Sequence, residues 1–205
     1  MTRAALAAIL VIGAPTIAAA SLLQRARKSA ANHLDAATAG VDGGAGIGRA
    51  AAVCNLHPKG DAADASGPLG TVTFLRPLLA GLAEISYDIS GLTPGLHGLH
   101  VHEAANFSQG CLSTGGHYNP LGEDHGSQLF SQRHMGDLGN VEADAHGVAK
   151  GVLKAPVKLT GPLSIVGRAL VIHGGQDDLG LGGNTSSRAT GNAGGRVACG
   201  RIVEQ

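Results

Sequence analysis

The chain has 205 residues, and its 15 Lys and Arg balance 15 Asp and Glu. This balance argues against a strongly basic nucleic-acid-binding protein, and the 43% hydrophobic fraction argues against disorder throughout the chain. The length allows one domain with extensions or two small domains. The 33 Gly indicate many turns and loops, and with two Tyr, three Phe and no Trp the core has to consist mainly of Val, Leu, Ile and Ala.

Residues 1–20 are typical of a secretory signal peptide. Arg3 precedes an uncharged run over residues 4–20, and Ala18-Ala19-Ala20 offers a small-residue cleavage site before Ser21. A run of about 17 residues is marginal for a membrane span, so an uncleaved anchor is the weaker alternative. The basic, acid-free stretch that follows leaves an organelle transit peptide as another alternative. We expect a secreted, extracellular protein without a membrane segment after cleavage.

Residues 21–48 are rich in Ala and Gly and predict a flexible linker or pro-segment without a core of its own. Periodic structure begins near Arg49, so the folded domain is expected over residues 49–205. That length is sufficient for a single hydrophobic core.

Short runs of alternating apolar and polar residues follow one another between Gly, Pro and Asp breaks. In Ala83–Ile89 the odd positions are apolar and the even ones polar, as in a half-buried strand. The pattern predicts strands over Ala50–Leu56, Gly70–Leu75, Ala83–Ile89, Leu96–Glu103, Val148–Lys154, Ala169–His173 and Val197–Ile202. We therefore expect an all-β antiparallel sandwich or barrel, with two long functional loops over residues 104–140 and 174–196.

Eight of the ten His lie between His97 and His173. On a predicted strand, His100-Val101-His102 places both imidazoles on one face. The candidate metal ligands are His100, His102, His117, His125, His134, His173 and Asp137. Six imidazoles and one carboxylate suit copper and zinc, and they supply eight bonds to two four-coordinate ions if one imidazole binds both. Each His alone is better explained as a loop or core residue, so the metal hypothesis depends on the group.

Longer motifs surround these residues. They are Gly98–Glu103, Gly110-Cys111, Gly116–Pro120, His125-Gly126, Arg133–Asn140, Gly167–His173, Asp177–Gly180 and Thr190–Gly200. Together they closely resemble the copper/zinc superoxide dismutase family of the secreted type, in order and with small gaps over residues 49–203. The resemblance implies a Greek-key antiparallel β-sandwich or flattened barrel of about eight strands with two long functional loops.

The resemblance also assigns roles to the candidates by position. Copper would be held by His100, His102, His117 and His173, and zinc by His117, His125, His134 and Asp137. Asp177 matches a carboxylate that hydrogen-bonds His100 and His125 and so orients their rings. Arg196 matches an arginine that attracts and orients a small anion beside copper.

The implied reaction converts two superoxide ions and two protons into oxygen and hydrogen peroxide, with copper alternately reduced and oxidised. His117 would bridge the metals, leave copper in the reduced state and carry a proton, while zinc would order the first long loop. Cys111 and Cys199 match the family's disulfide, which a secreted location permits. Cys54 would be a buried, inert thiol.

The chain departs from the family pattern at the usual homodimer contact. Ala104 and Ala105 replace an aromatic residue and a Gly, and Arg201 replaces a small apolar residue. A buried, unpaired Arg is costly, so these residues argue against the usual dimer.

Other departures concern charge and glycosylation. Gly175 and Ala189 stand where relatives frequently carry Lys, so we expect weak electrostatic steering of an anion. Asn106 and Asn184 each begin an N-x-S/T triplet on an expected loop and are candidate N-glycosylation sites.

Two other functions are compatible with such a domain. A related copper-delivery protein carries an added M-x-C-x-x-C module, but no Cys precedes Cys54 in this sequence. An inactive, zinc-stabilised extracellular binding module would lack a ligand or Arg196, and neither is missing here. We therefore expect an enzyme that acts on superoxide, with copper and zinc as cofactors.

Overall fold

The computed structural model describes residues 50–60, 67, 69–75 and 82–205. The expected signal peptide and linker lie outside these residues. The described strands are β1 (Ala50–Leu56), β2 (Gly70–Leu75), β3 (Ala83–Ile89), β4 (Gly95–His102), β5 (Ser108–Cys111), β6 (Asp137–Ala143), β7 (Ala149–Ala155), β8 (Ala169–His173), β9 (Arg196–Arg201) and β10 (Val203–Glu204). Two short helices accompany them, the 3-10 helix η1 (Leu112–Thr114) and α2 (Thr185–Thr190).

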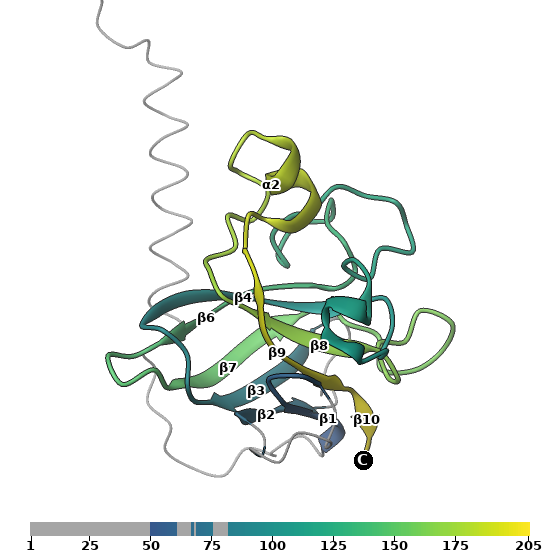
Figure 1. Ribbon diagram of the computed structural model, residues 1–205. Helices are drawn as coiled ribbons and strands as arrows, with labels where there is room; N and C mark the ends of the chain where they lie inside the picture. Colours follow the sequence, from purple (N-terminus) through teal and green to yellow (C-terminus); the bar gives the residue numbers. More distant parts are fainter. Residues whose placement is uncertain (1–49, 61–66, 68, 76–81) are drawn as a thin grey trace, which may run out of the picture. The chain divides into compact units, whose positions relative to one another are not determined.

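Nine of the described strands form two antiparallel sheets. One sheet has the order β10-β1-β2-β3-β7, and the other has the order β6-β4-β8-β9. Residues 52, 54, 56, 72, 74, 85 and 89 of the first sheet contribute to the same core as residues 99, 101, 138, 141, 170 and 172 of the second. This arrangement confirms the predicted all-β sandwich. Figure 1 shows α2 and the loop that precedes β6 on the same side of these sheets.

The core consists mainly of aliphatic side chains, as the composition predicts. Phe74, Ile85, Leu99 and Ile172 are fully buried, and burial of each such side chain stabilises the fold by about 1.5–3 kcal/mol. In β4 this packing uses alternate residues, because Leu99 and Val101 belong to the core cluster. The residues between and after them therefore face the opposite side of the sheet.

Four predicted strands, β1, β2, β3 and β8, have the bounds that the sequence pattern gives, and three others differ by one residue at each end. The predicted loop over residues 104–140 is wrong in part, because it contains β5, η1 and the start of β6. The first residues of β6, Asp137 and Gly139, are loop-favouring residues in isolation, but they lie beside β4, where His100 pairs with Asp137.

The second predicted loop, 174–196, contains the six-residue helix α2. Asn184 caps this helix with its side-chain oxygen, which accepts a hydrogen bond from the Ser187 backbone N–H. Among the described residues, neither helix has the length and hydropathy that a bilayer crossing requires.

Candidate metal centre

Strand β4 places His100 and His102 on the face opposite the core, where loops cover them completely. Both residues have 0% exposed surface. His117 joins them from the loop after η1 through an isolated antiparallel bridge with His102, and His173 joins them from the end of β8. Ligand atoms of these four His all lie within 4.8 Å of one another. The structure thus brings together the four residues expected to bind copper. We call His100, His102, His117 and His173 the first set.

Backbone carbonyls determine which ring nitrogen each imidazole offers. His102 Nδ1 lies 2.9 Å from the Gly115 carbonyl, and His173 Nδ1 lies 3.1 Å from the Gly194 carbonyl. A carbonyl only accepts hydrogen bonds, so each Nδ1 carries the proton and each Nε2 keeps its lone pair. The two Nε2 atoms lie 3.3 Å apart, so two lone pairs face each other unless a cation lies between them.

Two further nitrogens confirm that the site fits a cation. His100 Nδ1 and His117 Nε2 are buried and have no hydrogen-bond partner within the described part of the chain. A buried, unsatisfied acceptor is costly, and metal coordination removes that cost. Imidazole nitrogens suit copper, so the donor set fits the ion that the sequence indicates.

A second cluster surrounds Asp137 at the start of β6. Its Oδ1 lies 3.0 Å from Nδ1 of His117, 3.0 Å from Nδ1 of His125 and 3.4 Å from Nδ1 of His134. Its Oδ2 accepts hydrogen bonds from the backbone N–H groups of Gly126 and His134. Three imidazoles and one carboxylate are a combination of ligands that zinc commonly takes. We call His117, His125, His134 and Asp137 the second set.

On this side the four residues whose ligand atoms all lie within 4.8 Å of one another are His100, His117, His125 and Asp137, with His100 in the place of His134. His100 faces both groups, but its Nε2 already lies 2.9 Å from Asp177 Oδ2. His134 Nδ1 lies 3.4 Å from His117 Nδ1 and 3.4 Å from Asp137 Oδ1, so His134 lies beside this group without belonging to it. His117 belongs to both groups, and among the described residues only its Nδ1 is hydrogen-bonded, to Asp137, so its Nε2 is left for the other group.

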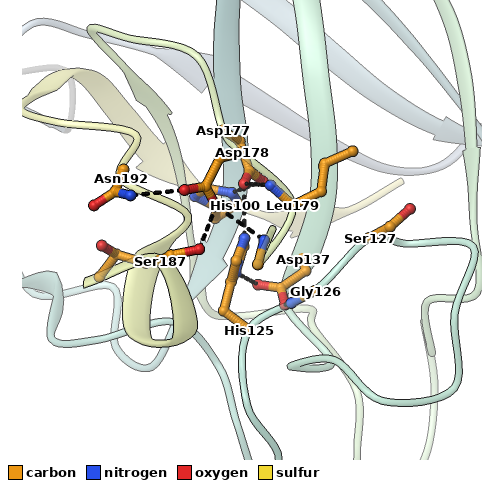
Figure 2. A network of polar contacts seen from close by, with 12 residues as sticks. His100, His125, Gly126, Ser127, Asp137, Asp177, Asp178, Leu179, Ser187 and Asn192 are labelled. Carbon is orange, nitrogen blue, oxygen red and sulfur yellow. Dashed lines mark hydrogen bonds and ion pairs between the residues drawn. The ribbon is translucent and has the colours of Figure 1, made fainter. Parts of the chain in front are cut away.

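Asp177 connects the two sets, as Figure 2 shows. Its Oδ1 lies 2.7 Å from His125 Nε2, and its Oδ2 lies 2.9 Å from His100 Nε2. The backbone of Asp177 is held on both sides by the Asn140 side chain, at 2.8 Å in each case. Such a partner fixes ring orientation and tautomer in residues of each set. The sequence predicted Asp177 for this place, but it missed Asn140, whose only signal is its position within the Arg133–Asn140 motif.

The turn after α2 leaves room for this carboxylate. Gly191 ends the helix with φ 64°, and its backbone N–H donates to the Ser187 carbonyl. A Cβ atom at Gly191 would lie against Asp177 Oδ1 and His125 Nε2. The neighbouring Asp178 makes separate bonds, accepting from Ser187 Oγ at 2.7 Å and Asn192 Nδ2 at 2.6 Å.

Burial keeps the imidazoles of the first set neutral. Desolvation lowers the pKa of His102 to about 2, of His100 to about 3 and of His173 to about 4, and it lowers the pKa of His117 as well. Burial opposes ionisation of Asp137 and Asp177, but hydrogen bonds from the His side chains outweigh it and hold both pKa values well below the usual range. Neutral imidazole and ionised carboxylate are the forms that bind metals.

His125 differs from the other imidazoles. Burial lowers its pKa, but hydrogen bonds to Asp137 and Asp177 prevail and raise it to about 9. At neutral pH this ring is therefore protonated when no metal is present, and a metal ion that binds its Nδ1 has to displace a proton.

Arg196, at the start of β9, lies against the loop that carries the 3-10 helix. Its Nη1 donates to the Cys111 carbonyl at 2.7 Å, and its Nη2 donates to the Gly115 carbonyl at 2.7 Å. The Gly115 carbonyl also accepts a hydrogen bond from the His102 ring, so the Arg196 guanidinium and the His102 imidazole share one acceptor. Desolvation lowers the Arg196 pKa, but from a value so high that the group stays a cation.

The predicted disulfide joins Cys111 to Cys199 across a sequence separation of 88 residues. It connects the end of β5 to the middle of β9, and both sulfur-bearing residues lie in a small apolar cluster with Ala169 and Val171. Cys54 is buried in the main core, as expected.

Of the residues that depart from the family pattern, Ala104, Ala189 and Arg201 are exposed, and Ala105 and Gly175 are half-buried. Arg201 is exposed and its Nη2 donates to the Ala105 carbonyl at 2.9 Å, so in this single chain it is neither buried nor unpaired. Asn106 and Asn184, the sequon residues, are exposed on loops. The oligomeric state and the glycosylation of these residues remain predictions.

Comparison with known proteins agrees with the metal centre. The family model for copper/zinc superoxide dismutase matches residues 69–202. A superoxide dismutase [Cu-Zn] from Yarrowia lipolytica is 55% identical over 135 residues, which cover 65% of this chain and 88% of that protein. The chain therefore belongs to the copper/zinc superoxide dismutase family, in agreement with its β-sandwich and its two imidazole groups that share His117.

Proposed function

We propose that this enzyme disproportionates superoxide with copper held by His100, His102, His117 and His173 and zinc held by His117, His125, His134 and Asp137. The observation that carries the assignment is the position of His117. His117 belongs to both groups; its Nδ1 lies 3.0 Å from Asp137, while its Nε2 is buried without a hydrogen-bond partner among the described residues. A single imidazole can therefore serve two ions.

A copper ion held by the first four His would supply the one-electron redox change, and a zinc ion, which has no redox chemistry, would stabilise the loop that holds it. The protein residues supply the rest. His117 Nε2 can hold a proton whenever that nitrogen has no metal bond, and Asp137 keeps the ring oriented meanwhile. Asp177 fixes His100 and His125, and Arg196 provides a positive charge for an anion. Two superoxide ions and two protons give one oxygen and one hydrogen peroxide.

Metal analysis with a superoxide assay tests this proposal on the full chain. We expect one copper and one zinc per chain, activity in the loaded protein, and loss of most activity with lower retention of both metals in His117→Ala. His146→Ala is the matched control, because His146 is exposed and lies outside both groups. Equal metal content in His117→Ala and His146→Ala would contradict the bridging assignment.

The alternative functions find less support. Neither a copper-delivery protein nor an inactive binding module requires both complete ligand sets and a neighbouring arginine. Here each ligand candidate is buried at its expected place, and Arg196 is held by three carbonyls and a hydroxyl.

For the location of the enzyme, we propose secretion, with a mature chain that begins at Ser21. The support is the uncharged run that ends in Ala18-Ala19-Ala20 and the two exposed sequon residues. Expression of the full chain in a secreting eukaryotic host should give a product in the medium whose N-terminal sequence starts at or near Ser21. A soluble product that retains residues 1–20 would contradict the cleavage.

We also propose that attraction of superoxide depends on contact with Arg196 more than on a long-range field. From residue 49 onward the sequence has eleven Lys and Arg against thirteen Asp and Glu, and Gly175 and Ala189 add no cations to the second loop. Salt screens fields beyond about 8–10 Å, and this chain has little such field for salt to remove. The rate should therefore fall less steeply with rising salt than in relatives that keep the lysines. Arg196→Ala should raise the apparent barrier by about 1–2 kcal/mol.

The double variant Gly175→Lys plus Ala189→Lys should raise the rate at low salt and make the rate fall more steeply with ionic strength. Rates measured against ionic strength for the parent and both variants check this. A steep fall in the parent, unchanged by the added lysines, would show that the interpretation of this loop is wrong.

A further inference from the structure

Thr114, at the end of η1, is a buried residue with a polar contact to each of two functional groups. Its side chain has 0% exposed surface. Its Oγ1 lies 2.9 Å from Arg196 Nη1 and 3.2 Å from His102 Nδ1. It also lies 2.9 Å from the carbonyl oxygen of Cys111. Neither the sequence motifs nor the family assignment gives this hydroxyl a role.

The donors and acceptors around the hydroxyl leave one arrangement. Arg196 Nη1 can only donate, and His102 Nδ1 carries a proton because it donates to the Gly115 carbonyl. The hydroxyl proton therefore goes to the Cys111 carbonyl. One lone pair accepts from Arg196, and the other faces the His102 Nδ1–H, a proton that it shares with the Gly115 carbonyl. All three hydrogen-bonding positions of the hydroxyl are filled inside the protein.

The guanidinium keeps free donors in this arrangement. The two Nη1–H groups are shared among the Cys111 carbonyl, the Leu112 carbonyl and Thr114, and one Nη2–H donates to the Gly115 carbonyl. The Nε–H and the second Nη2–H have no acceptor among the described residues, so they are the groups that an anion can bind. The orientation of these groups depends on how Nη1 is held.

We propose that Thr114 is a positioning residue for superoxide disproportionation, whose hydroxyl sets the position of the Arg196 guanidinium relative to the His102 ring. The proposal rests on the proposed function, because it takes His102 as a copper ligand and Arg196 as the anion-binding group. A methyl group in place of Oγ1 would lie 2.9 and 3.2 Å from two nitrogens. These distances are shorter than ordinary carbon contacts of about 3.5–4.0 Å, so the guanidinium and the ring would have to move apart.

Azide binding and the copper(II) electron paramagnetic resonance spectrum of the metal-loaded full chain test this role. Thr114→Val has nearly the same shape as Thr but lacks the hydroxyl, and Thr114→Ser keeps the hydroxyl. We expect Thr114→Val to raise the azide Kd about three- to tenfold, the size of one lost hydrogen bond of ordinary strength, and to change the copper(II) spectrum. Thr114→Ser should restore both to values near those of the parent.

Ser113→Ala is the matched control. Ser113 is the adjacent hydroxyl on the same helix, but it bonds Gln109, Asn106 and Gly110 and neither Arg196 nor His102. It should leave azide affinity and the spectrum unchanged. If Thr114→Val does not load copper, Thr114→Ala replaces it in the comparison with Thr114→Ser.

The outcomes separate two kinds of failure. A parent that binds copper and is active, with a Thr114→Val or Thr114→Ala variant that matches it in azide affinity and spectrum, would overturn the positioning role. So would a Thr114→Ser variant that resembles Thr114→Val. A parent without copper or without activity would instead contradict the proposed function.

Discussion

Replacement of Cys111 and Cys199 by Ser is expected to lower the free energy of unfolding by about 4–5 kcal/mol. The disulfide closes a loop with a sequence separation of 88 residues, and a long closed loop restricts the unfolded chain strongly. The loss is a large share of the roughly 5–15 kcal/mol that stabilises a typical domain. The variant should therefore unfold at a clearly lower denaturant concentration than the parent.

Denaturant unfolding of the parent and the variants, all without metals, measures this loss. Cys111→Ser alone and the double variant should lose similar amounts, because each removes the same covalent bond. Removal of the bond also frees the segment whose Cys111 carbonyl accepts from Arg196, so activity of the loaded enzyme should fall as well. A stability loss below about 1 kcal/mol would contradict the chain-entropy argument.

The second large effect is expected for Asp177→Asn, which should lower the affinity for both metals by about 10- to 100-fold. The Asp177 carboxylate accepts from His100 Nε2 and His125 Nε2 with different oxygens. An amide offers one oxygen and one N–H group, so one of the two rings would face a donor instead of an acceptor. That ring has to turn or change its tautomer, and the nitrogen that it offers to a metal changes with it.

Competition with a chelator, followed separately for copper and zinc, measures this effect. Asp178→Asn is the control, since the Asp178 carboxylate bonds Ser187, Asn192 and the Gly180 backbone N–H and has no hydrogen bond to an imidazole within the described part of the chain. Affinities in Asp177→Asn equal to those in Asp178→Asn would show that the carboxylate does not orient the two rings.

The strands were predictable because burial repeats every second residue. In β3 the buried Ala83, Ile85 and Ile89 alternate with exposed Glu84 and Asp88, as the sequence indicates. Strand β6 was not predictable from the sequence, because Asp137, Gly139 and Asn140 favour loops and become a strand only through pairing with β4. Helix α2 has six residues and no apolar stripe, so only its caps, Asn184 and Gly191, signal it.

The ligand residues were predictable from residue type and motif, whereas the nitrogen that each one offers was not. The tautomer of His102 depends on the Gly115 carbonyl and that of His173 on the Gly194 carbonyl, 13 and 21 residues away in the sequence. The role of Thr114 was missed for the same reason, because its hydroxyl meets Arg196 at a separation of 82 residues.

Gly191 combines two requirements that are usually met by different residues. The end of α2 requires its left-handed backbone, and the Asp177 carboxylate requires that it has no side chain. A substitution here would disturb a helix terminus and both metal sets through the same added carbon. In a mutational screen such a variant would be classified as a folding defect, although the direct effect of the added carbon is a steric clash with the Asp177 carboxylate. Any transfer of this loop to another scaffold therefore has to carry Gly191 with it.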